Sequence, residues 1–224
     1  MTRNIQDIAP LLAGYFMDIE SDETTFEENN KLVTHNAQRL GLYHKYLGLL
    51  HDSWFMKTNI TANKFSITLN DFTTHVFSDV IVEKKKLNID HDKLVFPIQV
   101  DFETTNLTFN KVDEDGNIQS IEQTNISEYL CEQIISIEND EIEIGLVVWK
   151  DGIDDERGQN ILILMSVKNI TLTELQDSAW KEIFGNTYDN YYKYFKTQLD
   201  TGRYLSNQSN CYELYDEYEG QLNG

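Results

Sequence analysis

Residues 142–148 read Ile-Glu-Ile-Gly-Leu-Val-Val, and residues 161–165 read Ile-Leu-Ile-Leu-Met. The first run alternates apolar residues with others, which is typical of a β-strand with one buried face, because successive side chains of a strand point to opposite sides. The second run is apolar throughout, which indicates a central strand covered on both faces. The two runs together predict a sheet at the centre of the fold.

Further strands are predicted on either side of these two runs. Five apolar stretches suit strands, at 54–60, 65–69, 94–103, 106–112 and 128–138. Asp115-Gly116 predicts a hairpin turn, because glycine accepts the positive φ that a tight turn needs. Pro97 has no N–H to donate, so its strand is expected at an edge or with a bulge. Residues 72–83 suit either helix or strand, and Val80-Ile81-Val82 favours strand.

Helical patterns stand at both ends of the chain. Apolar residues recur seven positions apart from Phe26 to Leu47 and predict a helix over about 25–48, with Thr25 and Glu28 as its capping box. Thr173 and Gln176 form a second capping box, ahead of helices expected up to Gly185 and over about 188–200.

The predicted fold class is therefore α+β, with a mostly antiparallel sheet flanked by an N-terminal helix and C-terminal helices. We expect a single domain, helical over 1–50, sheet over 51–170, and helical and Tyr-rich over 171–224. Six residues on the inward strand positions should be buried together: Ile67, Leu69, Ile144, Leu146, Ile163 and Met165.

The chain is strongly acidic, with 38 Asp and Glu against 18 Lys and Arg and a net charge of -20. Such a surface repels nucleic acid and anionic membranes and attracts basic proteins. Residues 113–157 hold 14 acids and two bases. This region is either a hydrated face or a docking surface for a basic partner. The docking hypothesis assigns partner binding to Glu141, Glu143, Asp151, Asp154, Asp155 and Glu156.

No sequence motif commits the chain to a reaction. A Gly-x-Ser-x-Gly elbow, a Gly-rich phosphate loop and a His-Glu-x-x-His helix are all missing, and no catalytic residue, metal site or cofactor is predicted. The alternative is a metal-dependent hydrolase built on His51-Asp52 and His91-Asp92. Both pairs lead into predicted strands, so we expect His51 and His91 not to converge on one ion. Cys131 lies in an apolar stretch and is predicted to be a buried hydrophobe.

One stretch resembles known families. It reads Leu-His-Asp-Ser at 50–53 and continues with a predicted strand, a polar turn at 59–64 and a second predicted strand. It covers about 20 residues and resembles the opening of the β domain in several groups of small uncharacterised bacterial proteins, some of which are immunity proteins of toxin systems. Those groups have no established catalytic residues, so the resemblance assigns no role to any residue. From the residues themselves, we predict that 51–53 form a turn whose Asp and Ser side chains cap local backbone groups.

These observations favour a non-enzymatic module of the bacterial cytoplasm that binds a basic protein, such as an immunity-type inhibitor of a basic toxin. The first ten residues lack the pattern of a signal peptide, and no apolar run is long enough to span a membrane. A third hypothesis is a structural or regulatory protein that self-associates, since eight of the 12 tyrosines lie between Tyr188 and Tyr218. The oligomeric state is not predicted.

Overall fold

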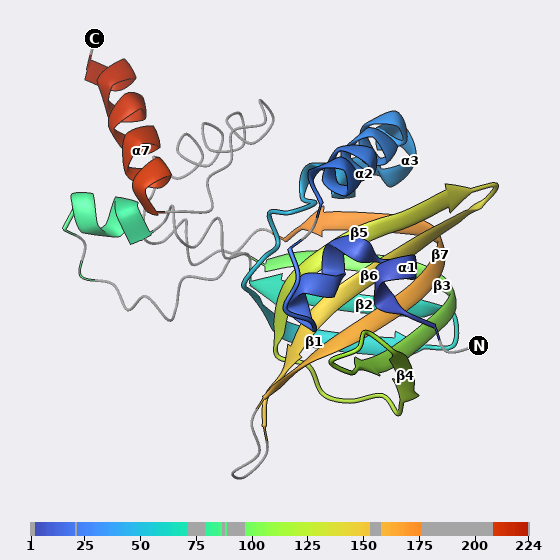
Figure 1. Cartoon of the computed structure of the whole chain (residues 1–224). Coiled ribbons are helices and arrows are strands. Elements are labelled where there is room, and N and C mark those ends of the chain that lie inside the picture. Colours follow the sequence, from blue (N-terminus) through green and yellow to red (C-terminus); the bar gives the residue numbers. More distant parts are fainter. Residues whose placement is uncertain are drawn as a thin grey trace.

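A computed structural model of the chain describes residues 3–20, 22–70, 79–86, 88, 97–152, 158–175 and 208–223. Seven antiparallel strands form its sheet: β1 (Ser53–Thr61), β2 (Lys64–Asn70), β3 (Pro97–Val112), β4 (Ile118–Ile121), β5 (Glu128–Glu138), β6 (Glu141–Lys150) and β7 (Gln159–Glu174). Helices lie N-terminal and C-terminal to this sheet, so the predicted α+β class is confirmed (Figure 1).

The strand pairings form a closed ring. Along the sheet the order is β2-β1-β5-β6-β7-β3-β4, and β2 also pairs with β3. The pairing between β1 and β5 is short, with only Ser53 opposite Tyr129 and Trp54 opposite Glu128 among the described residues. We call this two-pair contact the seam. Ring closure removes most of the unpaired strand edges that an open sheet would present.

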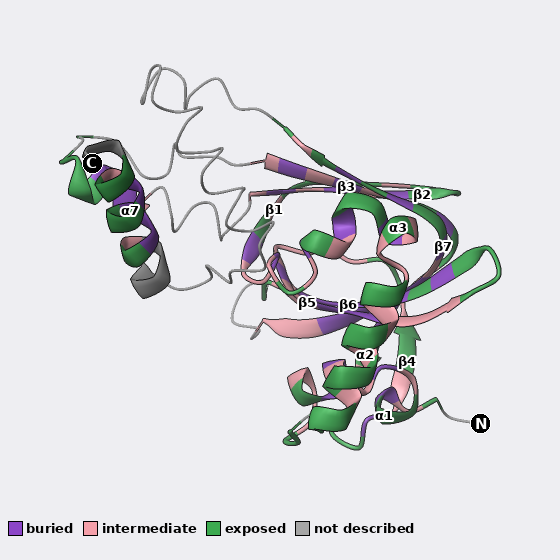
Figure 2. Cartoon of the chain, turned by 90° about the horizontal axis from the view of Figure 1, so that it is seen from above, coloured by how far each residue is buried: buried purple, intermediate pink, exposed green. Residues whose placement is uncertain are grey.

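The core fills the inside of this ring. The six residues predicted to be buried together are all buried in one cluster, and Met165 is the most exposed of them at 3%. Phe65, Phe102 and Tyr129 add aromatic volume to the same cluster. In Figure 2 the buried residues line the strands, whereas the outer side of α2 is exposed.

The N-terminal segment covers the outside of β6 and β7. It consists of α1 (Ile5–Ile8) and η1, a 3-10 helix (Pro10–Tyr15), and its Leu12 packs with Val147 and Leu162. A Cβ atom placed on Gly145 would lie 2.8 Å from Leu12 Cδ1, so the glycine makes room for this contact. The all-apolar run at 161–165 is thus covered on both faces, as predicted.

The predicted helix over 25–48 is wrong in its continuity. It is divided into α2 (Glu23–His35), α3 (Ala37–Leu40) and the 3-10 helix η2 (Gly41–Lys45). The breaks fall at Asn36, which has a non-helical φ of -107°, and at Gly41, which has a φ of +57°. Because the helix turns there, Tyr43 enters the core of the sheet while Phe26 stays 58% exposed. The N-cap is Asp22, not Thr25.

The predicted strand at Val80-Ile81-Val82 is also wrong, because residues 79–84 are helical. Thr173 does not begin a helix, since β7 continues to Glu174 and pairs Thr173 with Gln99. Tertiary pairing with β3 outweighs the local capping pattern there. The helices expected over 176–200 and the part of the ambiguous segment at 72–78 lie outside the described residues.

The turn predicted at Asp115-Gly116 is confirmed, whereas the strand of Pro97 is not at an edge and has no bulge at the proline. Gly116 has a φ of +82°, and its N–H donates to the Asp113 carbonyl at 2.9 Å, which forms the hairpin turn between β3 and β4. Pro97 is the first residue of β3, where a missing N–H is tolerated. β3 lies between β2 and β7 and is bulged around Thr104, away from the proline.

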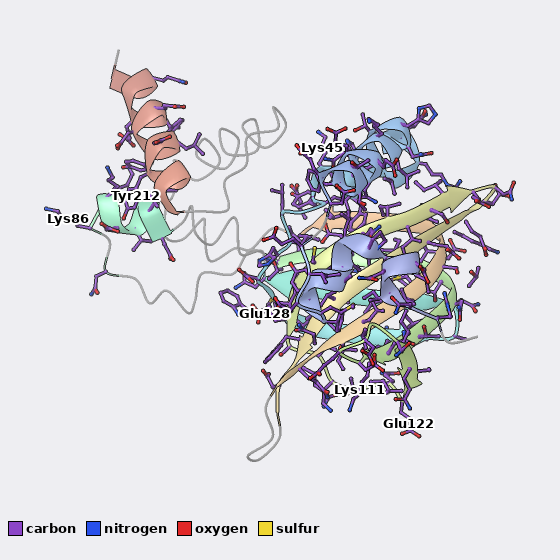
Figure 3. The ribbon with its side chains drawn as sticks, viewed as in Figure 1. Lys45, Lys86, Lys111, Glu122, Glu128 and Tyr212 are labelled. Atoms are coloured by element: carbon purple, nitrogen blue, oxygen red, sulfur yellow. The ribbon has the colours of Figure 1, made fainter. Side chains whose placement is uncertain are left out.

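The C-terminal helix α7 (Gln208–Asn223) packs against the helical segment at 79–84. Lys84 Nζ lies 2.8 Å from Asp216 Oδ1 and 5.4 Å from the centre of the Tyr212 ring. The Tyr212 hydroxyl donates to Glu83. Figure 3 shows Lys86 and Tyr212 together in this part of the molecule.

Candidate functional site

A cavity of about 900 Å³ lies beside β5, next to the seam. Because β1 meets β5 over only two residue pairs, the edge of β5 beyond the seam is covered by helices and not by a strand. The Asn29 side chain of α2 donates to the Ile134 carbonyl at 2.6 Å and takes the place of a strand partner. α2, η1, η2 and β5 all contribute residues to the cavity wall.

Glu132 of β5 is the buried acid in this wall. Its residue is 8% exposed, and its Oε1 accepts a hydrogen bond from the Gly48 N–H. Oε2 is fully enclosed and has no hydrogen-bond partner among the described residues. Burial raises the pKa of the Glu132 carboxyl from its usual 4.5 to about 7, although hydrogen bonds from Gly48 and Tyr129 oppose the shift. The group therefore exchanges a proton near neutral pH.

Phenol and thiol groups surround Glu132. The hydroxyls of Tyr43 and Tyr129 lie 3.2 Å apart within the core. Burial and then the nearby Glu132 charge raise the pKa of Tyr43 and of Tyr129. Burial, followed by the neighbouring Cys131 and then by Glu132, raises the pKa of Tyr15 on η1. Burial and then the Glu132 charge raise the pKa of the Cys131 thiol to about 11, so this thiol stays protonated and unreactive at neutral pH. Cys131 was predicted to be a buried hydrophobe; it packs in the outer apolar cluster but is only partly buried.

Glu132 was not predicted as a site residue, because in the sequence it stands as one acid among the 14 of residues 113–157. A usable signal exists in the chain: Glu132 and Gln133 together interrupt an otherwise apolar stretch between Tyr129 and Ile134. The bulge between Tyr129 and Cys131 shifts the strand alternation by one residue. That shift directs Glu132 to the same side as Tyr129, and strict alternation would not have placed it there.

The predicted His51-Asp52 pair lies in the turn before β1. His51 Nδ1 and Asp52 Oδ1 are 2.8 Å apart, and their side chains are 44% and 41% exposed. The turn itself is as predicted, with a φ of +61° at Asp52. The carboxylate contacts the imidazole of its neighbour. His91 and Asp92 lie outside the described residues, and no metal-binding group of three His, Cys, Asp or Glu occurs within the part of the chain that the structure describes.

The predicted partner-binding residues fall at two ends of β6. Glu141 and Glu143 are exposed beside the β5–β6 turn and point away from Ile142 and Ile144, which are buried. Asp151 is exposed just beyond the other end of the strand, about 26 Å from Glu143 at 3.3 Å per residue. The adjoining loop therefore does not extend the Glu141 region into one patch. Asp154, Asp155 and Glu156 lie outside the described residues.

A second acidic region surrounds the seam. Burial, followed by the charges of Asp52 and Asp151, raises the pKa of Glu128, while His51 lowers it. Glu128 is thus close to both acids, and Figure 3 shows it at this end of the sheet, apart from Lys111 and Glu122. Acidic residues are therefore distributed over several parts of the surface.

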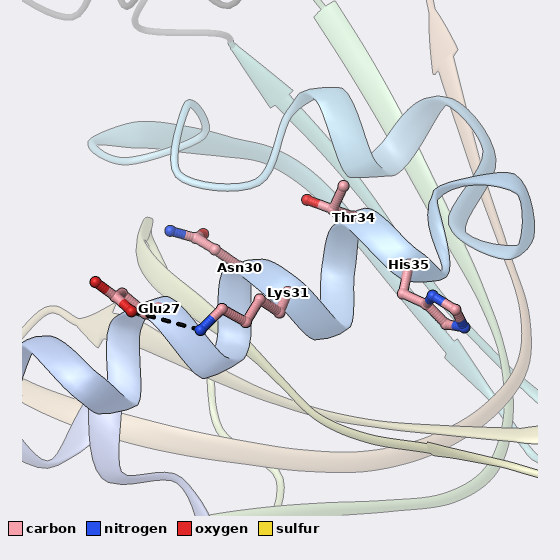
Figure 4. Close-up of a pocket in the computed structure, with 5 residues that line it drawn as sticks. All are labelled: Glu27, Asn30, Lys31, Thr34 and His35. Atoms are coloured by element: carbon pink, nitrogen blue, oxygen red, sulfur yellow. Dashed lines mark hydrogen bonds and ion pairs between the residues drawn. The ribbon is translucent and has the colours of Figure 1, made fainter.

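The outer side of α2 carries a shallow hollow lined by Glu27, Asn30, Lys31, Thr34 and His35 (Figure 4). All five residues come from one helix. Lys31 Nζ lies 3.4 Å from Glu27 Oε2, and these side chains are 75% and 61% exposed. The described residues that line this hollow all belong to α2, so the hollow is less enclosed than the cavity at Glu132.

Comparisons with protein-family models, with curated proteins and with solved structures found no match to this chain. Among the described residues, no helix is long and apolar enough to cross a membrane.

Proposed function

We propose that this chain is a non-enzymatic binding module for a basic protein and that the β5–β6 hairpin is its docking element. An immunity-type inhibitor of a basic toxin would be one module of this kind. The observation that carries the proposal is the set of exposed carboxylates at the hairpin end: Glu138, Asp140, Glu141 and Glu143. The hairpin extends beyond the body of the sheet in Figure 1, so a partner can reach it from several sides.

The charges of this hairpin are not neutralised by ion pairs within the described residues. Glu141 accepts a hydrogen bond from Thr105 Oγ1 at 2.9 Å, and Glu143 accepts one from Ser136 Oγ at 3.5 Å. Arg39 approaches the turn but donates to the Asn139 carbonyl at 2.6 Å. Unpaired exposed carboxylates keep their hydration and their field, and a basic partner would be drawn to them over about one Debye length, roughly 8–10 Å at physiological salt.

Two variants with the same net charge test the proposal. The first neutralises the hairpin through Glu138→Gln, Asp140→Asn, Glu141→Gln and Glu143→Gln. The control neutralises four exposed acids elsewhere, through Asp18→Asn, Glu20→Gln, Glu114→Gln and Asp115→Asn. Association with a basic partner protein, or with a synthetic Lys- and Arg-rich peptide as probe, is measured by stopped flow over a salt series.

We expect the hairpin variant to associate about 10-fold more slowly at low salt and the control variant to change much less. The difference between the two should shrink as salt is added, because screening removes the local field. Equal slowing in both variants would contradict a hairpin docking site and would leave only a diffuse acidic surface.

The other two hypotheses receive less support from the described residues. The exposed His51-Asp52 pair has no third ligand beside it in the described part of the chain. Tyr215 and Tyr218 are buried, and Tyr212 donates to Glu83, so these tyrosines of α7 serve contacts within the chain. They therefore offer little free aromatic surface for self-association.

A further inference from the structure

We propose that the cavity beside β5 binds a small organic amine, with the Glu132 carboxylate as its counter-ion and an apolar body lying between α2 and η1. This site is separate from the acidic hairpin and does not depend on the function proposed above. Its volume of about 900 Å³ is within the range of small-molecule sites, which is about 300–1,000 Å³.

The enclosed oxygen of Glu132 is the first argument. A buried acceptor without a partner destabilises the fold, because it has lost its hydrogen bonds to water. The backbone N–H of Gly48 donates to Oε1 and the Tyr129 hydroxyl favours the charged carboxylate, yet Oε2 accepts no hydrogen bond from the described residues. The terminal torsion of a glutamate side chain is broad, so rotation of the carboxylate, at the expense of the Gly48 hydrogen bond, would turn Oε2 toward the cavity that this residue lines.

The groups around Glu132 indicate a cationic donor. The titratable neighbours of this carboxylate are Tyr43 of η2, Tyr129 and Cys131 of β5, and Tyr15 of η1, none of which can carry a positive charge. His44 also lines the cavity, but its Nδ1 lies 2.5 Å from the Gly41 carbonyl. Among the described residues, no Lys or Arg lies in the cavity wall. An ammonium group would supply both the missing donor and the missing positive charge.

The rest of the wall suits an apolar body. Leu11, Phe26, Val33 and Leu47 contribute hydrocarbon surface, and Asn30 and Thr34 add polar groups. Phe26 is 58% exposed, so a ligand that covers its ring would remove apolar surface from water. The net charge of -20 disfavours an anionic ligand and favours a cation.

Amine binding must also move a proton. Most of the Glu132 population is protonated at pH 6, because the pKa of this group is about 7. An ammonium ion binds the ionised carboxylate, so the proton that leaves Glu132 passes to the buffer. The ligand keeps its own charge, and no other bond changes. A neutral ligand would bind without this release.

Calorimetric titration with three probes of similar shape tests the site. They are phenethylamine, 2-phenylethanol and 3-phenylpropanoate, each titrated at pH 6 and at pH 8 in two buffers that differ in ionisation enthalpy. We expect phenethylamine to bind at least about 10-fold more tightly than the alcohol and to release protons at pH 6 but not at pH 8. The carboxylate probe should not bind.

Variants then assign the effect to the cavity. Glu132→Gln should abolish the preference for the amine and the proton release, whereas the matched control Glu143→Gln removes an exposed charge of β6 and should retain both. Phe26→Ala changes an exposed residue and keeps the fold, so it should weaken amine binding several-fold without changing the protons released per ligand bound. Equal binding of amine and alcohol, no binding of either, or an unchanged preference in Glu132→Gln would overturn the proposal.

Discussion

Replacing Glu132 by Gln should change how the stability of the protein depends on pH. The pKa of this carboxyl is raised in the folded state from 4.5 to about 7, so the folded state holds the proton more tightly than the unfolded chain does. The stabilisation from Glu132 is therefore complete below pH 4.5 and is lost as the pH rises toward 7. At 1.36 kcal/mol for each pH unit, the loss amounts to about 3 kcal/mol.

Urea unfolding of wild type and Glu132→Gln at several pH values between 4.5 and 8 measures this effect. The difference in unfolding free energy between the two proteins cancels the contribution of the other acids, including Asp101 and Asp113, whose pKa values are lowered in the folded state. We expect the difference to move in favour of the Gln variant by about 3 kcal/mol across this range. Glu143→Gln controls for the loss of one negative charge. A difference that stays constant with pH would refute a buried, proton-binding Glu132.

Three other changes test separate parts of the fold. Leu12→Ala should lower the unfolding free energy by about 2–5 kcal/mol, because Leu12 is fully buried over the sheet. The control Leu42→Ala, at a site 39% exposed, should lower it by about 0.5 kcal/mol or less. Equal losses of unfolding free energy in urea would contradict the packing of η1. Gly116→Ala should cost about 1–2 kcal/mol, because its φ is +82° and the new Cβ would lie 2.8 Å from Met17 Sδ; an unchanged thermal midpoint would argue against this turn. In a Cys211→Ser background, alkylation of Cys131 at pH 8 should be about 100-fold slower in the folded protein than in urea, because the pKa of its thiol is about 11 rather than 9.0. Comparable alkylation rates in the folded and unfolded states would show that the thiol is accessible.

Strands such as β2 were predictable because the burial of their residues alternates along the strand. β5 has the same bounds as the predicted stretch 128–138, and Ile144 and Met165 face the core as their positions require. Ring closure was not predictable, because it depends on the pairing of β2 with β3 and on the short seam, and neither leaves a periodic signal. The helix breaks at Asn36 and Gly41 were missed for a related reason: a seven-residue spacing continues through a bend when both sides of the bend face the same core.

The candidate sites were predictable to different degrees. The exposure of Glu141 and Glu143 follows from strand period alone, since each has a buried isoleucine after it. Their distance from Asp151 follows from the length of β6, and a loop close in sequence was mistaken for a neighbour in space. Glu132 depends on a bulge and on a covering helix that donates from Asn29, and no local pattern specifies either.

The seam also sets the order in which this chain can fold. Hairpins such as β5–β6 pair residues close in sequence, whereas the seam joins Ser53 to Tyr129 and gains only two residue pairs for closing a long loop. Closure is therefore a late step, and folding dominated by such distant pairings takes milliseconds to seconds. Until the ring closes, the edges of β1 and β5 are unpaired and can join another copy. Mutual repulsion between chains of net charge -20 keeps nascent copies apart during that interval, so the acidity of this protein also acts as a safeguard against aggregation.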